Sequence, residues 1–331
     1  MSHILHVTGR PKEARDFGER ARQVGKTLGD LAVGVGGTFY KGAACYFAGD
    51  YGPALDLLRE TVECLGGDLG RDRYGLVGLP AVMARAYLTW IHAERGELEA
   101  ALAHGHDGVR LAETVDHPYS LIIAWWGLLY LHATRQELEQ ISEFGDRALA
   151  RARAWDLPLP SAITAGIMGH AYAVGGRTAE GLALLEESVR LHESSGLVYF
   201  HTLIVSYLAE AYLLSGRPDE ARVFGEQALG LARKRGERGF EAWSLRALGE
   251  IAASTGRPSV EGAENYYREA LALATERGMR LLAALCHLGL AKIHRQKGAT
   301  GQPAHLAIAL KEFREMAMPF WLEKTEAILA R

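Results

Sequence analysis

The sequence predicts an all-α fold in which helix pairs stack in a row and build a superhelical solenoid. Three observations predict it. A short phrase recurs about every 40 residues, and the apolar residues before each recurrence follow helical spacing. No alternating polar and apolar pattern is long enough to indicate a β-strand.

The recurring phrase begins with a position that we call the mark, which is glycine in every case but one. Polar residues follow the mark, and a new helical run then opens on alanine. A glycine suits the end of a helix, because the left-handed backbone found there favours it. The marks are Gly9, Gly49, Gly96, Gln136, Gly176, Gly216, Gly256 and Gly298, which are 40, 47, 40, 40, 40, 40 and 42 residues apart.

The residues before each mark predict the first helix of a pair, and those after it predict the second. Most units carry a large residue eight positions before the mark, a small one seven before and a ring-bearing one four before. In the unit with mark Gly216 these are Leu208, Ala209 and Tyr212, and Ala221 follows five positions after the mark. The first three positions share one helix face, and the small residues allow two helices to cross closely.

We therefore expect a single domain over residues 1–331, with one helix pair in each unit. The irregular stretch 65–80 accounts for the spacing of 47 residues. The expected divisions are a leading half-unit, 1–30, and units at approximately 31–78, 79–116, 117–158, 159–197, 198–238, 239–279 and 280–331.

Composition and charge exclude several classes of protein. The formal net charge of −3 argues against a nucleic-acid partner, which requires a basic face. The most apolar stretch, 31–49, contains Lys41 and five glycines, so we expect no membrane span. No secretory signal is visible, and the three cysteines, Cys45, Cys64 and Cys286, lack disulfide or zinc spacing. These features predict a cytoplasmic protein.

No motif predicts catalysis, a cofactor or a metal. Gly25-Lys26-Thr27 resembles the end of a phosphate-binding loop, but Arg20 stands where that motif needs its first glycine. His287 and His294 share a helix face without a nearby carboxylate or thiolate to complete a site. Because no nucleophile or acid–base constellation emerges, we expect a non-enzymatic protein.

The pattern of 40-residue helix pairs resembles the tetratricopeptide repeat, whose usual period is ~34 residues. More narrowly, the chain resembles the C-terminal repeat region of bacterial signalling proteins in which an adenylate/guanylate cyclase domain and an AAA-type ATPase domain come first. The resemblance implies a regulatory region whose units touch mainly their neighbours. Neither catalytic domain is visible in this sequence. The stretches that carry the resemblance are 116–121 (DHPYSL), 267–274 (YREALALA), 286–290 (CHLGL), 313–316 (FREM) and 320–323 (FWLE).

The positions ten, six and three before each mark form a second stripe on the first helices, which in such superhelices faces the concave side. We expect this stripe to bind a partner protein or a peptide, or a small-molecule effector. The alternative is that its aromatic residues fill space and its charges pair in a ladder. The candidate binding residues are Phe39, Tyr46, Trp90, Trp126, Tyr130, His170, Glu210, Arg246, Glu250, Lys292 and Arg295.

The leading functional hypothesis is a sensory scaffold belonging to a bacterial signalling ATPase or nucleotide cyclase. Only eight residues precede Gly9, so we expect the chain to begin within a unit of a longer protein. A stand-alone receptor for a small molecule or peptide is one alternative. A second is a scaffold that forms a homodimer through the apolar C-terminal helix around residues 318–322.

Overall fold

The computed structural model describes residues 2–254, 257–298 and 302–329, which form α-helices joined by short turns and contain no β-strand. One 3-10 helix, Gly67–Arg71, lies in the irregular stretch after α4. The α-helices are α1 (Ser2–Val7), α2 (Pro11–Leu28), α3 (Leu31–Ala48), α4 (Tyr51–Cys64), α5 (Pro80–Glu94), α6 (Leu98–Val115), α7 (Pro118–Arg135), α8 (Leu138–Ala154), α9 (Pro158–Val174), α10 (Thr178–Ser195), α11 (His201–Leu214), α12 (Pro218–Arg235), α13 (Arg238–Ser254), α14 (Arg257–Arg277), α15 (Arg280–Lys297), α16 (Gln302–Glu315) and α17 (Pro319–Leu329).

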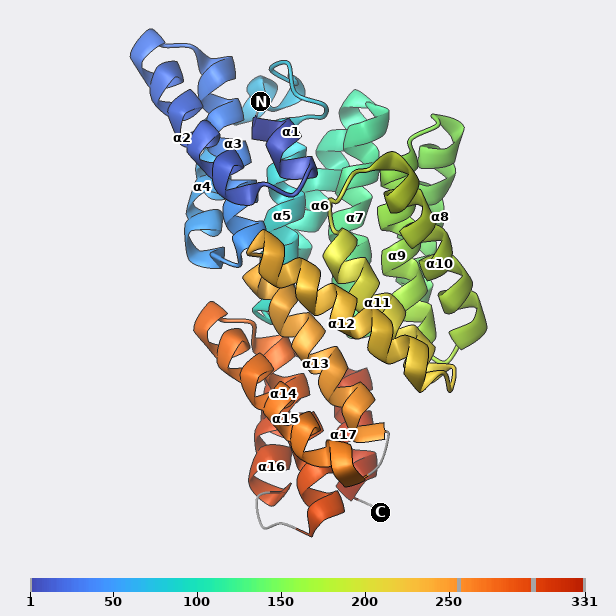
Figure 1. Cartoon of the computed structure of the whole chain (residues 1–331). Coiled ribbons are helices and arrows are strands. Elements are labelled where there is room, and N and C mark those ends of the chain that lie inside the picture. The colour runs from blue at the N-terminus through green and yellow to red at the C-terminus, as the bar shows by residue number, and fades with distance from the viewer. Residues whose placement is uncertain (1, 255–256, 299–301, 330–331) are drawn as a thin grey trace.

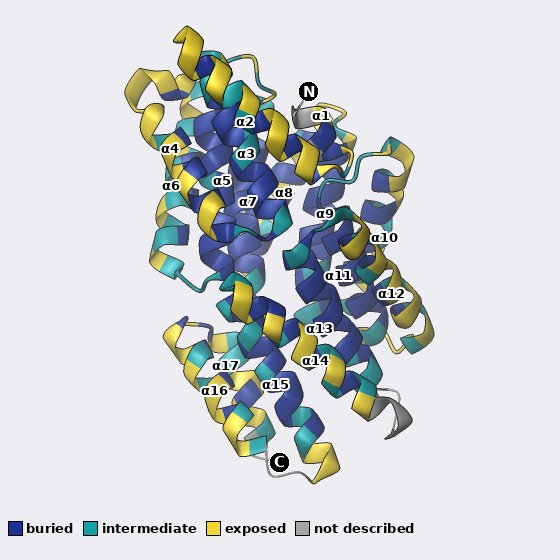
Figure 2. Ribbon diagram, turned by 60° about the vertical axis from the view of Figure 1, so that its left-hand side comes forward, coloured by how far each residue is buried: buried dark blue, intermediate teal, exposed yellow. Residues whose placement is uncertain are grey.

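The helices alternate between a buried first helix and an amphipathic second helix. In α7 every residue from Ser120 to Ala133 is buried, which fits its nearly unbroken apolar sequence. In α12 only Ala221, Gly225, Ala228 and Ala232 are buried, a single stripe at helical spacing. Figure 2 shows the second helices exposing their outer faces while the first helices lie inside. The predicted all-α solenoid is confirmed.

The marks end the first helices as the sequence predicts. Gly49 and Gly216 both have φ of +77°, and Gln136 adopts the same left-handed region with φ of +60°. Gly256 lies outside the described residues. Left-handed backbone is unfavourable for a residue with a Cβ atom, so Gln136 costs more here than glycine would. Its side chain gains a contact in return, because Nε2 donates to the carbonyl of Ala133 over 3.0 Å.

In four consecutive units the ring-bearing residue four positions before the mark contacts the residue just after the mark, across the turn. In two consecutive units the ring is histidine and the partner is glutamate: His92 Nδ1 and His132 Nδ1 each lie 2.5 Å from a carboxylate oxygen, of Glu97 and Glu137 respectively. In the next two units tyrosine faces arginine. The guanidinium carbons of Arg177 and Arg217 lie 3.9 and 4.4 Å from the ring centroids of Tyr172 and Tyr212. The same two positions are therefore in contact in all four units, through a histidine–glutamate pair in two of them and a tyrosine–arginine pair in the other two.

Each unit touches mainly its neighbours, as expected, but the superhelix also closes on itself, which the sequence did not predict. Each of three first helices packs on a helix five pairs further along: α3 on α13, α5 on α15, and α7 on α17. Figure 1 shows the yellow and orange helices returning beneath the blue and cyan ones. One superhelical turn therefore contains five helix pairs. Its first helices surround the axis of the superhelix, and we call this central region, which side chains largely fill, the bore.

Contacts between successive superhelical turns form a seam at the marks. The backbone N–H of Val198 donates to the carbonyl of Val7 over 2.9 Å. Arg277 Nη1 lies 2.6 Å from Asp50 Oδ1. The backbone of Gly49 lies against that of Gly239, with no room for a Cβ atom between them. These contacts join residues roughly 190 to 230 positions apart, far beyond the period of the repeat.

The last expected unit, 280–331, contains a third helix, α17, in addition to its pair. Trp321 Nε1 donates to the carbonyl of Thr134 in α7 over 2.8 Å, and Arg135 Nη1 donates to the carbonyl of Ala317 over 2.6 Å. Lys324 Nζ lies 4.5 Å from the ring centroid of Phe320. The apolar residues that suggested a homodimer are thus used in contacts within the chain.

No helix in the described part of the chain is both long and apolar enough to span a bilayer.

Candidate functional site

The predicted stripe lines the bore, but the structure does not present it as an open groove. Phe39, Tyr46, Trp90, Trp126 and Tyr130 are all buried, with at most 3% of each residue exposed. They are buried because the second superhelical turn closes over the concave face of the first. The packing alternative therefore describes most of this surface, and any binding role requires the bore to open.

Aromatic rings fill the wide part of the bore. The ring centroid of Trp90 lies 4.8 Å from that of Tyr87 and 5.0 Å from that of Phe200, both in edge-to-face geometry. Phe47 contacts both Phe200 and Phe240 from the later turn. Sequence reasoning missed Phe200 and Phe240, because they precede or begin first helices and lie outside the stripe. The repeat period gives no signal of contacts across the seam.

A small cavity of about 30 Å³ lies at one end of the bore, and its wall is apolar and aromatic. Three of the predicted residues, Phe39, Trp90 and Trp126, are part of this wall. Its volume suits a single water molecule. We call this end the aromatic mouth; its lining is Val7, Phe39, Tyr40, Ala43, Val77, Met83, Tyr87, Trp90, Tyr119, Ile123, Trp126, Leu159 and Tyr199.

Internal hydrogen bonds hold the two indoles of the aromatic mouth in place. Trp126 Nε1 donates to Thr164 Oγ1 over 2.8 Å, and Trp90 Nε1 donates to the carbonyl of Trp126 over 3.1 Å. Both indole donors are therefore satisfied within the protein. A ligand at this mouth would meet ring faces and edges, with the half-buried tyrosines Tyr40 and Tyr119 at the rim.

A buried carboxylate, Glu94, joins the two superhelical turns in the middle of the bore. The hydroxyl of Tyr130 donates to Glu94 Oε1, and Trp243 Nε1 donates to the same oxygen over 3.1 Å. Within the described residues Oε2 has no hydrogen-bond partner. Burial raises the pKa of Glu94 to about 7, against the opposing effect of the two donors. Sequence reasoning missed this residue. A signal was present, because every other described mark has an uncharged residue two positions before it.

Beyond Glu94 the bore ends in a second cavity of about 30 Å³, which we call the charged mouth. Its lining includes Tyr130, His170, Glu210, Trp243, Arg246 and Trp321. Glu210 forms an ion pair with Arg246, and His170 Nε2 lies 3.2 Å from Glu210 Oε2. Burial alone would raise the pKa of Glu210, but Arg246 and His170 lower it to about 2. The charges of this mouth are therefore paired with one another.

The predicted charged residues continue as a ladder along the later first helices. Lys292 Nζ lies 3.4 Å from Glu250 Oε1, one unit beyond the pair of Glu210 and Arg246. Arg295 Nη1 donates to the carbonyl of Ile328 over 2.9 Å. Arg246 thus pairs with Glu210 of the preceding unit. Glu250, four residues after Arg246, pairs with Lys292 of the following unit. This arrangement is the ladder that sequence reasoning held as the alternative.

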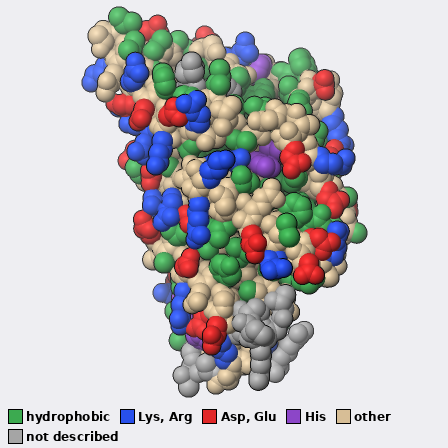
Figure 3. Space-filling view, viewed as in Figure 1, with side chains coloured by type: hydrophobic (Ala, Val, Ile, Leu, Met, Phe, Trp, Pro, Cys, Tyr) green, Lys and Arg blue, Asp and Glu red, His purple; other side chains and the backbone are tan. Residues whose placement is uncertain are grey.

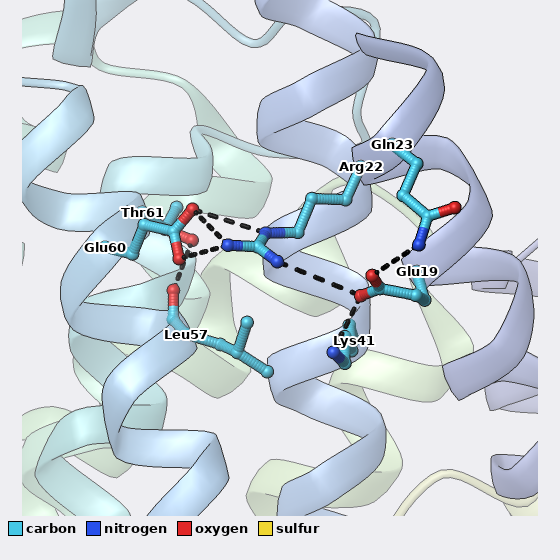
Figure 4. Close-up of polar contacts among 7 residues, drawn as sticks. All are labelled: Glu19, Arg22, Gln23, Lys41, Leu57, Glu60 and Thr61. Carbon is cyan, nitrogen blue, oxygen red and sulfur yellow. Dashed lines mark hydrogen bonds and ion pairs between the residues drawn. The ribbon is translucent and has the colours of Figure 1, made fainter. Parts of the chain in front are cut away.

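A larger hollow of about 660 Å³ lies outside the bore, between α2, α3 and α4. Figure 4 shows the charges on its walls: Arg22 Nη2 lies 3.0 Å from Glu60 Oε2, and Lys41 Nζ lies 2.7 Å from Glu19 Oε2. Two cations and two anions are paired here, so these four groups stabilise the packing of α2 on its neighbours. On the face shown in Figure 3, charges of both signs are interspersed.

The motifs considered for phosphate and metal binding have structural roles here. Gly25, Lys26 and Thr27 lie within α2, and a Cβ atom at Gly25 would clash with the backbone of Gly34 in α3. His287 Nδ1 lies 2.8 Å from His305 Nδ1, so these rings hydrogen-bond to each other. Among the described residues, no group of three or more potential ligands is placed to hold a metal ion.

The family comparison agrees with this geometry. Residues 201–276, which span α11 to α14, match the model of a family described as tetratricopeptide repeat. The two helix pairs within this stretch are therefore tetratricopeptide repeats. A comparison with curated proteins finds no match to this chain.

Solved structures with the same fold include several Rap proteins. A Rap protein complexed with Competence and Sporulation Factor superposes with a TM-score of 0.68 at 12% identity, over 99% of this chain and 96% of that one. The Rap conjugation gene regulator of plasmid pLS20, in complex with the Phr* peptide, gives 0.66 at 14% identity, over 88% and 77%. Apo RapI gives 0.58 at 11% identity, over 85% and 97%. At these identities the likeness shows the fold alone.

Proposed function

We propose that this tetratricopeptide-repeat chain is a non-enzymatic, cytoplasmic sensory scaffold that binds apolar side chains of a peptide or protein partner at the aromatic mouth. The observation that carries the proposal is the mouth itself. Its lining residues are apolar or aromatic, and none carries a charged side chain. They come from five successive first helices, α1 to α9, and from two connectors. Tryptophan and tyrosine are enriched among the few residues that dominate the binding energy of protein interfaces.

Binding at this mouth requires a wider bore. A cavity of about 30 Å³ accepts a water molecule but no side chain of a partner. To widen the bore, the later superhelical turn must move away from the first. This movement breaks seam contacts such as those of Val7 with Val198 and Asp50 with Arg277, and the ring contacts of Phe47. A ligand with higher affinity for the wider form would shift the population towards it. In this proposal, the change in superhelical pitch that accompanies binding is the signal.

Two contexts could use such a signal, and the observations support them differently. The fold of the Rap protein complexed with Competence and Sporulation Factor extends over nearly all of this chain, which favours a stand-alone peptide receptor. The resemblance of stretches such as 267–274 to cyclase–ATPase repeat regions favours a regulatory region tethered to a catalytic domain. An in-frame cyclase or ATPase coding segment next to this one in the genome would support the tethered context. A peptide retained in native mass spectra of the host-purified chain would support the receptor.

Peptide selection against the purified chain tests the binding site itself. Peptides are selected from a random library and their affinities measured by isothermal titration calorimetry. The double variant Tyr40→Ser, Tyr119→Ser removes two rim rings and should weaken the selected peptides at least tenfold. Trp155→Ser removes a ring that is exposed on the outer surface and should change nothing. Equal affinity for the rim variant and the wild type would overturn the proposed site.

A further inference from the structure

The second helix α2 exposes an apolar stripe at the start of the solenoid, away from the bore. Phe17, Val24 and Leu28 are 37%, 49% and 72% exposed. With the half-buried Ala21 they follow a spacing of four, three and four residues, so they share one face of α2. Val33 of α3 is exposed as well. A stripe with this spacing is the pattern by which one helix packs lengthwise on another.

The register of the repeat shows what covers this stripe in the other units. Phe17 lies eight residues after its mark, as do Phe144 and Phe224. Phe144 stacks on His132 with ring centroids 5.7 Å apart, and Phe224 stacks on Tyr212 at 5.2 Å. In both cases the partner ring belongs to the first helix of the same pair. The stripe on α2 is therefore the surface on which a first helix packs.

The positions equivalent to Val24 and Leu28 are also covered in later units. Leu111 and Leu231 lie fifteen residues after their marks, as Val24 does, and Val115 lies nineteen after its mark, as Leu28 does. All three are partly buried against the main core.

The helix that pairs with α2 covers only one end of this surface. That helix is α1, Ser2–Val7, whereas the later first helices contain 14 to 18 residues. Leu5 packs on Ala14 and Ala44 at the covered end. The rest of the stripe continues along α2 in the direction from which α1 comes.

We propose that this stripe is a docking surface for an additional α-helix, which lies along α2 in line with α1. The helix would be amphipathic, with apolar residues at spacings of three and four to meet Phe17, Val24 and Leu28. It would carry small residues where the two backbones approach, as Ala209 and Ala291 do in later first helices. Exposed Arg20, whose guanidinium lies 5.4 Å from the Phe17 ring, favours an acidic residue at the edge of the docked helix. The interface continues the one that α1 already forms.

A synthetic peptide with the sequence of α13, residues 238–254, is a suitable probe. It is a first helix, and it carries both acidic and basic side chains. Labelled peptide is titrated with the 331-residue chain and followed by fluorescence anisotropy. The double variant Val24→Glu, Leu28→Glu should weaken binding at least tenfold. Val223→Glu, on the outer face of α12 where valine is 59% exposed, is the matched control and should leave binding unchanged. Circular dichroism checks that all three proteins are equally helical.

Two outcomes would overturn the proposal. Absence of peptide binding, or equal affinity for wild type and the α2 variant, would show that the stripe does not accept a helix. Light scattering on the same proteins identifies the other occupant. A wild-type dimer that the α2 substitutions convert to a monomer would assign the stripe to a second copy of this chain instead of a partner helix.

Discussion

Replacing Glu94 with glutamine should remove much of the pH dependence of stability between pH 5 and pH 8. Burial raises the pKa of Glu94 from its usual 4.5 to about 7. Between these values the folded chain holds a proton that the unfolded chain releases. The unfolding free energy therefore falls as the pH rises through this window, and the contribution of Glu94 is lost above pH 7.

The expected size follows from the shift in pKa. One pKa unit corresponds to about 1.4 kcal/mol, so the full change from 4.5 to about 7 corresponds to about 3.4 kcal/mol. The part that falls between pH 5 and pH 8 makes Glu94 responsible for a loss of about 2.5 kcal/mol. Glutamine does not titrate, and its carbonyl oxygen can still accept from Tyr130 and Trp243. The unpaired amide group of the variant lowers its stability by a similar amount at every pH. The difference between the two pH values is thus the quantity to compare.

Urea denaturation followed by circular dichroism at pH 5, 6, 7 and 8 measures this difference. Glu143→Gln, on the exposed face of α8, is the control and should retain the wild-type profile. Glu237, whose pKa burial also raises to about 7, remains in every variant and supplies a residual slope. An unchanged loss of stability in Glu94→Gln between pH 5 and pH 8 would refute the assignment of a buried proton to this carboxyl.

Three further substitutions test the packing, the ion pairs and the acid sensitivity. Gly37→Ala should lower the unfolding free energy by about 1–3 kcal/mol, because the added Cβ would clash with the backbone of α2; Gly52→Ala, with no atom within 4 Å, should raise it by about 0.5–1 kcal/mol in the same urea titration. Arg246→Met should lower it by about 3–5 kcal/mol by leaving Glu210 buried without its cation, and adding Glu210→Leu should recover most of that loss in a double-mutant cycle. Burial lowers the pKa of His201 to about 4, so its neutral form contributes stability that is lost as the pH falls from 6.5 towards 4; His201→Leu should reduce this loss in acid titrations of the circular dichroism signal.

The helices and their turns could be predicted from the sequence because both follow the local period of the repeat. Each mark that the structure describes is a left-handed helix end, such as Gly49 or Gln136, and a small residue such as Gly169 permits a close crossing within its own pair. Local signals of this kind depend on residues within about one helix turn of one another. These local signals were sufficient to predict the order of the helix pairs.

The closure of the superhelix could not be predicted in the same way. Glu94 and Trp243 are 149 residues apart, and no residue pattern relates α5 to α13. Residues of the predicted stripe lie at both cavities: Phe39, Trp90 and Trp126 line one, and His170, Glu210 and Arg246 line the other. Whether those residues face solvent depends on the superhelical pitch. Pitch is the sum of many small crossing angles, which the sequence period does not determine.

Closure after five pairs also limits how the length of this protein can change. An open array tolerates the loss of a terminal repeat, because each repeat depends only on its immediate neighbours. Here α13, α15 and α17 cover the apolar inner sides of α3, α5 and α7. Truncation before α13 would uncover aromatic surface at the opposite end of the chain, including the rings around Trp90. Deletion series should consequently show an abrupt loss of solubility at that boundary, in place of the gradual decline expected of a modular array.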